Sequence, residues 1–141
     1  MDFDWTNYLK LSKSLQKLTL SDSISDMGIS EACQRTAVSR AYYAIYHIAL
    51  NFAERSLGYK RFINKEAGRN HTKLAECYKD KGIIDSDSDY KELGRILINT
   101  FYNRIKCDYD NEVKNTKSQM DNAILNAEDA LRIIERKLFN K

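Results

Sequence analysis

The sequence contains no proline and only five glycines among its 141 residues. An all-β sandwich or barrel needs turn residues about every 8–12 positions, so this scarcity argues against such a fold and favours long helices. The hydrophobic share of 43% and the charged share of 30% are typical of a folded globular chain. The length predicts one domain that covers residues 1–141.

Long hydrophobic runs are also missing. The longest uncharged stretch of note, from Ala41 to Ala53, includes polar residues and is shorter than the ~20 apolar residues that a membrane helix needs. The first residues, Met1 to Asp4, are acidic where a secretory signal would be basic. We therefore expect a cytoplasmic protein with no membrane contact.

The residues that usually hold metals and cofactors are few. Cys33, Cys77 and Cys107 are odd in number and far apart, which fits neither a disulfide framework nor a paired-cysteine zinc site. The two histidines, His47 and His71, are too few for a histidine-rich metal centre. No phosphate loop or dinucleotide fingerprint occurs. We expect reduced thiols, no metal and no cofactor.

The net charge is only +3, but the cations are unevenly distributed. Between Arg55 and Lys73 the only acid is Glu66. A concentration of cations attracts phosphate backbones, although many basic loops are merely solvated. The candidates for unspecific RNA contacts in this segment are Lys60, Arg61, Lys65 and Arg69.

Apolar residues spaced three and four apart predict five helices, at about 4–20, 30–58, 71–79, 90–108 and 116–138. Asp4 and Ser30 are the expected N-caps, and Gly58 is the expected stop of the second helix. The polar stretch 21–28 should end the first helix. Gly82 and the residues 85–89 should form the connection before the fourth helix.

Each helix except the third has an expected core stripe. In the first helix the stripe is Trp5, Tyr8, Leu11, Leu15 and Leu18. In the second it is Val38, Ala41, Ile45, Ile48 and Phe52. In the fourth it is Leu93, Leu97 and Thr100, flanked by Ile96 and Phe101. In the fifth it is Met120, Ile124, Ala127, Leu131, Ile134 and Leu138, a bundle-type seam.

The opposite face of the second helix is unusual. Arg40, Tyr43 and His47 lie there at spacings of three and four, where an ordinary surface helix carries Lys and Glu. A guanidinium and an imidazole are the groups that metal-free RNA cleavage needs, because the ribose supplies an internal nucleophile. The alternative is structural: His47 packs between helices and Arg40 pairs with a neighbouring acid.

A second constellation lies at the end of the fourth helix. Arg104 continues the core stripe of that helix, and Asp108 follows it by one turn, so the carboxylate can hold the guanidinium. A charge on a core-facing stripe is costly unless it is paired or used. A purely architectural Arg–Asp clamp is the competing interpretation.

Together these residues resemble the small bacterial HEPN (higher eukaryotes and prokaryotes nucleotide-binding) proteins. The resemblance rests on the run Arg-Thr-Ala-Val-Ser-Arg-Ala-Tyr-Tyr-Ala-Ile-Tyr-His at 35–47, on His71, and on Arg-Ile-Lys-Cys-Asp-Tyr-Asp at 104–110. It implies an all-α, up-and-down bundle of about five helices that forms a homodimer, with the motifs of both copies facing a shared cleft.

The resemblance also implies a function. Many HEPN proteins are metal-independent ribonucleases of toxin–antitoxin or other defence systems, often encoded beside a minimal nucleotidyltransferase antitoxin, whereas others are inactive binding modules. We therefore expect an RNA- or nucleotide-binding effector. In a cleaving protein Arg104 would bind the scissile phosphate, His47 would act as acid or base, Asp108 would orient Arg104, and Tyr109 would stack on a base. Arg40 is a further expected catalytic residue, and Tyr43, Lys106 and His71 are expected RNA contacts.

The sequence departs from the family pattern at one point. HEPN nucleases carry a histidine four to six residues after the motif arginine, but here Tyr109 occupies that place. Either Arg104 and Tyr109 form a degenerate site that binds without cutting, or His47 reaches the same cleft and supplies the imidazole. A non-catalytic adaptor that recruits a protein partner is the alternative function.

Overall fold

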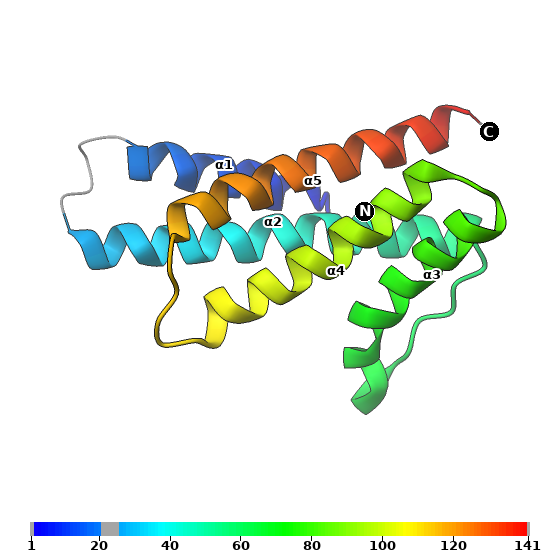
Figure 1. The fold of residues 1–141 in the computed structure, drawn as a ribbon, viewed down its shortest axis with the longest axis horizontal. Helices are drawn as coiled ribbons and strands as arrows, with labels where there is room; N and C mark the ends of the chain where they lie inside the picture. Colours follow the sequence, from blue (N-terminus) through cyan, green and yellow to red (C-terminus); the bar gives the residue numbers. More distant parts are fainter. Residues whose placement is uncertain (1, 21–25, 141) are drawn as a thin grey trace.

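The computed structural model describes residues 2–20 and 26–140. Its α-helices are α1 (Thr6–Leu20), α2 (Met27–Ser56), α3 (Asn70–Ile84), α4 (Ser88–Tyr109) and α5 (Thr116–Phe139), and a short 3-10 helix, η1 (Asn64–Arg69), precedes α3. No strand occurs in the described residues. The predicted all-helical fold with about five helices is confirmed (Figure 1).

The long helix α2 is the centre of the bundle and contacts each of the other four α-helices. Figure 1 shows α1, α2 and α5 running side by side, with α4 across them and α3 on the far side of α4. In the described residues α3 packs on α4, α2 and η1, without a comparable contact to α1 or α5. None of the described helices has the length and apolarity that a bilayer span requires.

The first helix begins as predicted but buries a different face. Asp4 accepts a hydrogen bond from the backbone N–H of Thr6 at 3.0 Å, so it caps α1. The buried residues of α1 are Leu9 and Ser12, whereas Leu11 is 43% exposed, so the predicted stripe is only partly correct. Because the Ser12 hydroxyl donates to the carbonyl of Ala37 at 2.7 Å, a serine can occupy the α1–α2 contact.

The start of the second helix was predicted wrongly and its end correctly. Asp26, rather than Ser30, is the cap: its side chain accepts hydrogen bonds from the N–H groups of Gly28 and Ile29 at 2.8 and 3.2 Å. The predicted polar break at 21–28 therefore extends too far, and its positions 21–25 lie outside the described residues. Gly58, with φ of +72°, ends the helix in the left-handed conformation that favours glycine.

The third helix is longer than the predicted 71–79, and the basic segment before it is partly helical. Gly82 lies inside α3 and is buried, so it does not belong to the connection. A β-carbon at Gly82 would lie 2.7 Å from the backbone nitrogen of Lys91, so this glycine permits close approach of α3 and α4. Gly82 was predicted to end the helix, but it lies within α3 and allows the two helices to pack closely.

The core stripes of α2, α4 and α5 are largely confirmed. Of the predicted stripe of α2, only Ile48 is not fully buried. In α4 the stripe is buried through Thr100 to Arg104. In α5 the stripe is buried at Met120, Ile124, Ala127 and Ile134, Leu131 is partly buried, and Leu138 is 55% exposed. Asp87 caps α4 by accepting from the N–H of Tyr90 at 3.0 Å.

The packing of α3 on α4 depends on Gly94, and we expect Gly94→Ala to destabilise the protein by about 1–3 kcal/mol. A β-carbon there would lie 2.9 Å from the carbonyl oxygen of Ala75 and 3.0 Å from the backbone nitrogen of Lys79. Urea unfolding measures the change. Gly68→Ala is the control, since nothing lies within 4 Å of its added carbon. Equal midpoints for both variants would contradict this packing.

Candidate nucleic-acid interface

A pocket of about 410 Å³ lies between the C-terminal half of α2 and the segment that leads into α3. Tyr46 and His47 of α2 line one wall, and Arg61, Phe62 and His71 line the opposite wall. Residues that are 14 or more positions apart in sequence therefore meet at one hollow. The basic segment singled out in the sequence forms its rim.

A single buried amide fixes the shape of this segment. Asn70 is 3% exposed, and its side-chain oxygen accepts hydrogen bonds from the Tyr59 hydroxyl and the N–H of Phe62 at 2.8 and 2.9 Å. Its side-chain nitrogen donates to the carbonyls of Phe62 and Ala67 at 2.8 and 3.0 Å. All four bonding positions of the amide are used. The chain from 59 to 70 is therefore folded back into one fixed loop.

Arg61 supplies a permanent positive charge to the pocket. Its Nε donates to Oε2 of Glu54 at 3.1 Å, and a second hydrogen bond joins the same two side chains. This bidentate bonding to Glu54 raises the pKa of Arg61. The side chain is still 43% exposed. The guanidinium is thus held in place while part of it stays accessible to a ligand.

His71 is stacked between two aromatic rings. The ring centroids of Tyr46 and Phe101 lie 4.5 and 4.8 Å from that of His71, and the Tyr42 hydroxyl oxygen lies 2.6 Å from its Nδ1. Burial, with the nearby Arg104 guanidinium and His47, lowers the pKa of His71 to about 4. The imidazole is therefore neutral at pH 7.

His47 lines the same pocket as His71, but one face of its ring is covered by Trp5. Its ring stacks on the indole of Trp5 at 3.6 Å between centroids. Burial, together with the charge of Arg61, lowers the pKa of His47. Arg40, one of the expected catalytic residues, lies 5.0 Å above the ring of Tyr8 and forms no ion pair within residues 2–20 and 26–140. Both side chains of the first constellation are thus covered by the N-terminal part of the chain.

The second constellation lies apart from the pocket. Nη1 of Arg104 is 3.4 Å from Oδ2 of Asp108, which also accepts from the Ser39 hydroxyl at 3.3 Å. The Arg104 side chain is only 7% exposed. Its guanidinium lies 5.2 to 5.6 Å from the rings of Tyr42, Tyr43 and Phe101. The predicted Arg–Asp clamp is present, with its arginine buried and its aspartate exposed at the surface.

Arg104 leaves one hydrogen-bonding group unused: its Nε is buried and has no partner in the described part of the chain. The rings around the guanidinium replace some of the lost hydration through cation–π contacts. His47 reaches this cage through Tyr43, whose ring centroid lies 6.1 Å from that of His47 and 5.2 Å from the Arg104 guanidinium. The histidine that lies closest to this cage is His71, through Tyr42 and Phe101. Sequence reasoning placed His71 only among the RNA contacts.

The other expected contact residues lie mostly on the surface. Tyr43 is half-buried beside Arg104, while Lys106 and Tyr109 are exposed at the end of α4, with 72% of Tyr109 accessible. Arg35 fixes this end of α4, since its Nη1 and Nη2 donate to the carbonyls of Cys107 and Asn111 at 3.2 and 3.3 Å. In the basic segment all four expected contacts, Lys60, Arg61, Lys65 and Arg69, are exposed.

Sequence reasoning missed three residues of the pocket region: Tyr46, Phe62 and Asn70. Tyr46 belongs to the tyrosine-rich run of α2, so the spacing of three between Tyr43 and Tyr46 was an available signal. Asn70 carries no such signal, because its role depends on the fold of the loop. The thiols of Cys33, Cys77 and Cys107 are free. Among the described residues no group of three or more potential ligands could hold a metal ion.

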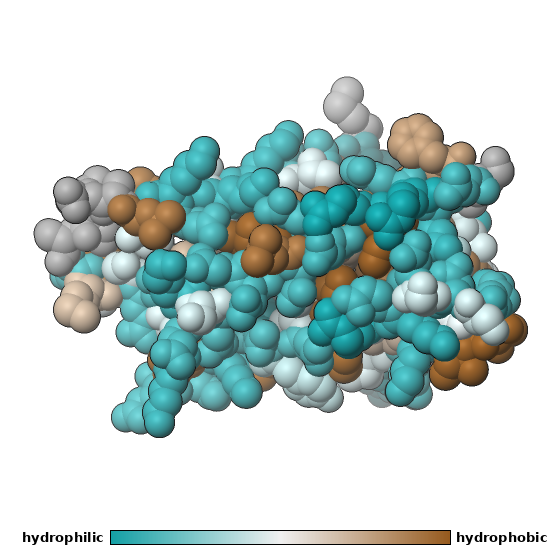
Figure 2. Space-filling view, turned by 45° about the horizontal axis from the view of Figure 1, so that its top comes forward, coloured by the Kyte–Doolittle hydropathy of each residue, from teal (hydrophilic) through white to brown (hydrophobic). Residues whose placement is uncertain are grey.

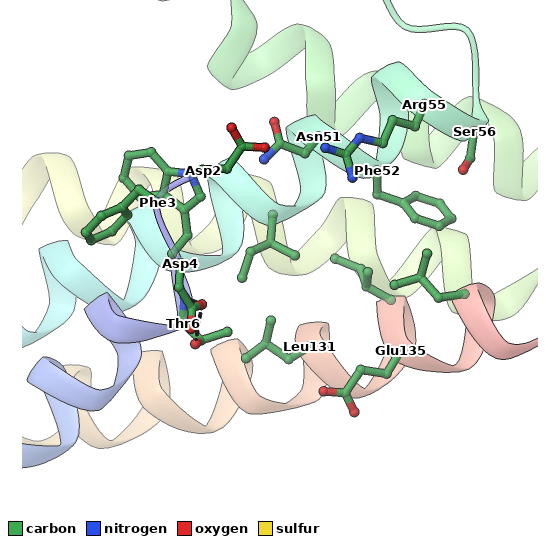
Figure 3. A pocket seen from close by; sticks show the side chains of 14 residues that line it. Asp2, Phe3, Asp4, Thr6, Asn51, Phe52, Arg55, Ser56, Leu131 and Glu135 are labelled. Carbon is green, nitrogen blue, oxygen red and sulfur yellow. Dashed lines mark hydrogen bonds between the residues drawn. The ribbon is translucent and has the colours of Figure 1, made fainter.

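A larger hollow, of about 450 Å³, lies between α2, α5 and the N-terminal segment (Figure 3). Figure 3 shows Phe52 and Leu131 turned into it, so its floor is apolar. Its lining carries both signs of charge, with Asp2, Asp4 and Glu135 as well as Arg55. This chemistry does not favour a phosphate. The pocket beside Arg61 combines a fixed cation with neutral imidazoles and is the stronger candidate.

No family model matches the sequence, and neither curated proteins nor solved structures give a significant match. We therefore infer the function from the residues and their arrangement.

The low pKa of His71 makes stability depend on pH. The unfolded chain protonates this histidine near pH 6.5, whereas the folded chain resists protonation until about pH 4. The native state therefore loses stability as pH falls through this window, by about 2 kcal/mol once the half-exposed ring is discounted for solvent. Chemical unfolding at several pH values measures the loss. His71→Phe should show a flatter profile, and parallel profiles for the two proteins would refute the assignment.

Proposed function

We propose that this protein binds RNA or a nucleotide at the pocket between α2 and the η1 segment. The observation that carries the proposal is the meeting of Arg61, His47 and His71 at one accessible hollow. A guanidinium binds phosphate oxygens, and neutral imidazoles bind sugar and base groups by hydrogen bonds. The ring of Phe62 in the same wall offers a surface for base stacking.

Charge around the pocket supports phosphate as the ligand. Two cations of the segment have an acidic partner: Arg61 is held by Glu54, and Arg69 lies 3.5 Å from Glu66. Lys60 and Lys65 form no ion pair within the described part of the chain, and both are exposed. The segment therefore keeps two uncompensated cations next to the pocket, which would bind a phosphate backbone without sequence preference.

Binding is better supported than cleavage. Metal-free RNA cleavage needs a base for the ribose hydroxyl and an acid for the leaving oxygen. Two neutral imidazoles can provide a base, but neither is protonated at pH 7 to act as the acid. Arg104, the expected phosphate ligand of a ribonuclease, is covered by rings and paired with Asp108.

The wider role follows from the HEPN resemblance. We place the chain as an RNA- or nucleotide-binding effector of a bacterial toxin–antitoxin or defence system, acting in the cytoplasm as a homodimer. A minimal nucleotidyltransferase is the partner that the resemblance suggests. The alternative of a purely structural adaptor leaves unexplained why Arg61 and two histidines surround a pocket.

Fluorescence anisotropy with a labelled single-stranded oligoribonucleotide tests the binding. Arg61→Gln should weaken binding about tenfold, because a charge-assisted contact to phosphate is lost. Lys60→Ala with Lys65→Ala should lower the slope of log affinity against log salt by about 1.4, the value for two contacts to a single strand. Lys10→Ala with Lys17→Ala removes two exposed charges from α1 and is the control. Equal losses in both double variants would contradict a defined site.

The same RNA should remain intact during long incubation in EDTA at pH 7, because no protonated imidazole is available in the pocket. Gel electrophoresis with end analysis measures this. Products with cyclic phosphate ends that form with the native protein, and are lost in both His47→Ala and His71→Ala, would instead establish a ribonuclease at this pocket.

A further inference from the structure

A groove of about 610 Å³ lies between α3 and α4, and residues of these two helices alone line it. In Figure 1 α3 lies on the side of α4 that faces away from α1 and α5. The groove is separate from the pocket beside Arg61, and its interpretation does not depend on RNA binding.

The groove wall from α3 is a regular helical stripe. Its residues occupy the positions i, i+3, i+4, i+7 and i+11 of one face: Thr72, Ala75, Glu76, Lys79 and Ile83. This spacing is the one by which a helix presents a face to a neighbouring helix.

The wall from α4 repeats the same spacing at Lys91, Gly94, Arg95, Ile98 and Tyr102. The two helices are joined by a short turn and run in opposite directions (Figure 1). Two adjacent helices that turn matching stripes toward one groove have the geometry of a bundle that lacks one helix. From Lys91 to Tyr102 the stripe spans about 16 Å, or three turns, at a rise of about 1.5 Å per residue.

The floor of the groove is apolar and accessible. Ala75 and Gly94 are buried beneath it, while Ile83 is 57% and Tyr102 is 52% exposed. Figure 2 shows a largely hydrophilic surface with several separate hydrophobic patches, one of them at the right-hand end of the view. A buried Tyr or Ile side chain is a strong anchor for a partner.

The edges of the groove carry uncompensated positive charge. Glu76 is paired with Lys73 at 3.2 Å, and Arg95 donates to Glu92 at 2.8 Å, so these groups are neutralised. Lys79 and Lys91, which stand on facing helices, form no ion pair in the described residues and are exposed. An occupant with carboxylates along both sides of its apolar face would complement them.

We propose that the α3–α4 groove binds an amphipathic helix of a partner protein, with an apolar stripe of about three turns flanked by acidic residues. The matched stripes fit a helix better than an extended peptide. Lys79 and Lys91 favour a helix that carries acidic residues. The apolar stripe of the partner would lie on Ile83, Ile98 and Tyr102.

The probe is a synthetic helical peptide of about 18 residues with leucines at the matching spacing and glutamates beside them. Two controls share its apolar content: a peptide with lysines in place of the glutamates, and a scrambled peptide without the stripe. Calorimetry on the full chain should show saturable binding of the acidic peptide. We expect the basic peptide to bind at least about tenfold more weakly and the scrambled peptide not to bind.

A charge reversal makes the test specific to this groove. In the double variant Lys79→Glu with Lys91→Glu the preference should change from the acidic to the basic peptide. Both lysines are exposed, so helicity and melting temperature should be retained and are measured alongside. The matched control, Lys10→Glu with Lys17→Glu on α1, changes the net charge equally and should keep the native preference.

Three results would overturn the proposal. One is equal affinity for the acidic and basic peptides, and another is an unchanged preference in the double reversal. The third comes from sedimentation of the free protein. A dimer that dissociates on Ile98→Glu, with RNA binding retained, would assign the groove to a second copy of this chain.

Discussion

The stack of His71 between Tyr46 and Phe101 is the contact on which the arrangement of this protein depends. It joins α2, α3 and α4 through one ring, and the Tyr42 hydroxyl holds that ring at 2.6 Å. The stack requires a neutral imidazole, because a second charge beside Arg104 would be costly in a partly buried site. It also determines where the basic segment lies, since Asn70 precedes His71 and folds that segment against α2.

Arg104 belongs to the same assembly from the other side. Its guanidinium contacts Tyr42 and Phe101, which both touch His71, and Asp108 neutralises part of its charge. This geometry braces α4 against α2 and gives the arginine a positioning role toward His71. A direct role on a phosphate would require the guanidinium to leave its cage of rings. The rings of Tyr42 and Phe101 thus connect Arg104 to His71. The accessible cations Lys60 and Lys65 lie in a different segment, between α2 and α3.

Local patterns predicted much of the fold, because helix periodicity and end signals act within one segment. The cap at Asp4 and the stop at Gly58 follow from backbone chemistry alone, although the cap of α2 is Asp26 and not the expected Ser30. The roles of Gly82 and Gly94 depend on how closely α3 approaches α4. This distance cannot be predicted from the sequence of either helix alone. Likewise, the Arg104–Asp108 pair follows from a spacing of four, but the meeting of His47, Arg61 and His71 needs the loop fixed by Asn70. The resemblance to HEPN proteins predicts Arg104 as the phosphate ligand, whereas the exposure of the two side chains favours Arg61 for that role.

The most direct measurement uses the fact that the chain has only two histidines. Carbon–proton NMR spectra of the imidazole rings, recorded while a short oligoribonucleotide is added, report on both sides of the pocket at once. The account predicts that the signals of His47 and His71 both shift and saturate together as binding proceeds at pH 7. Binding of the same RNA with neither histidine signal moving would contradict it.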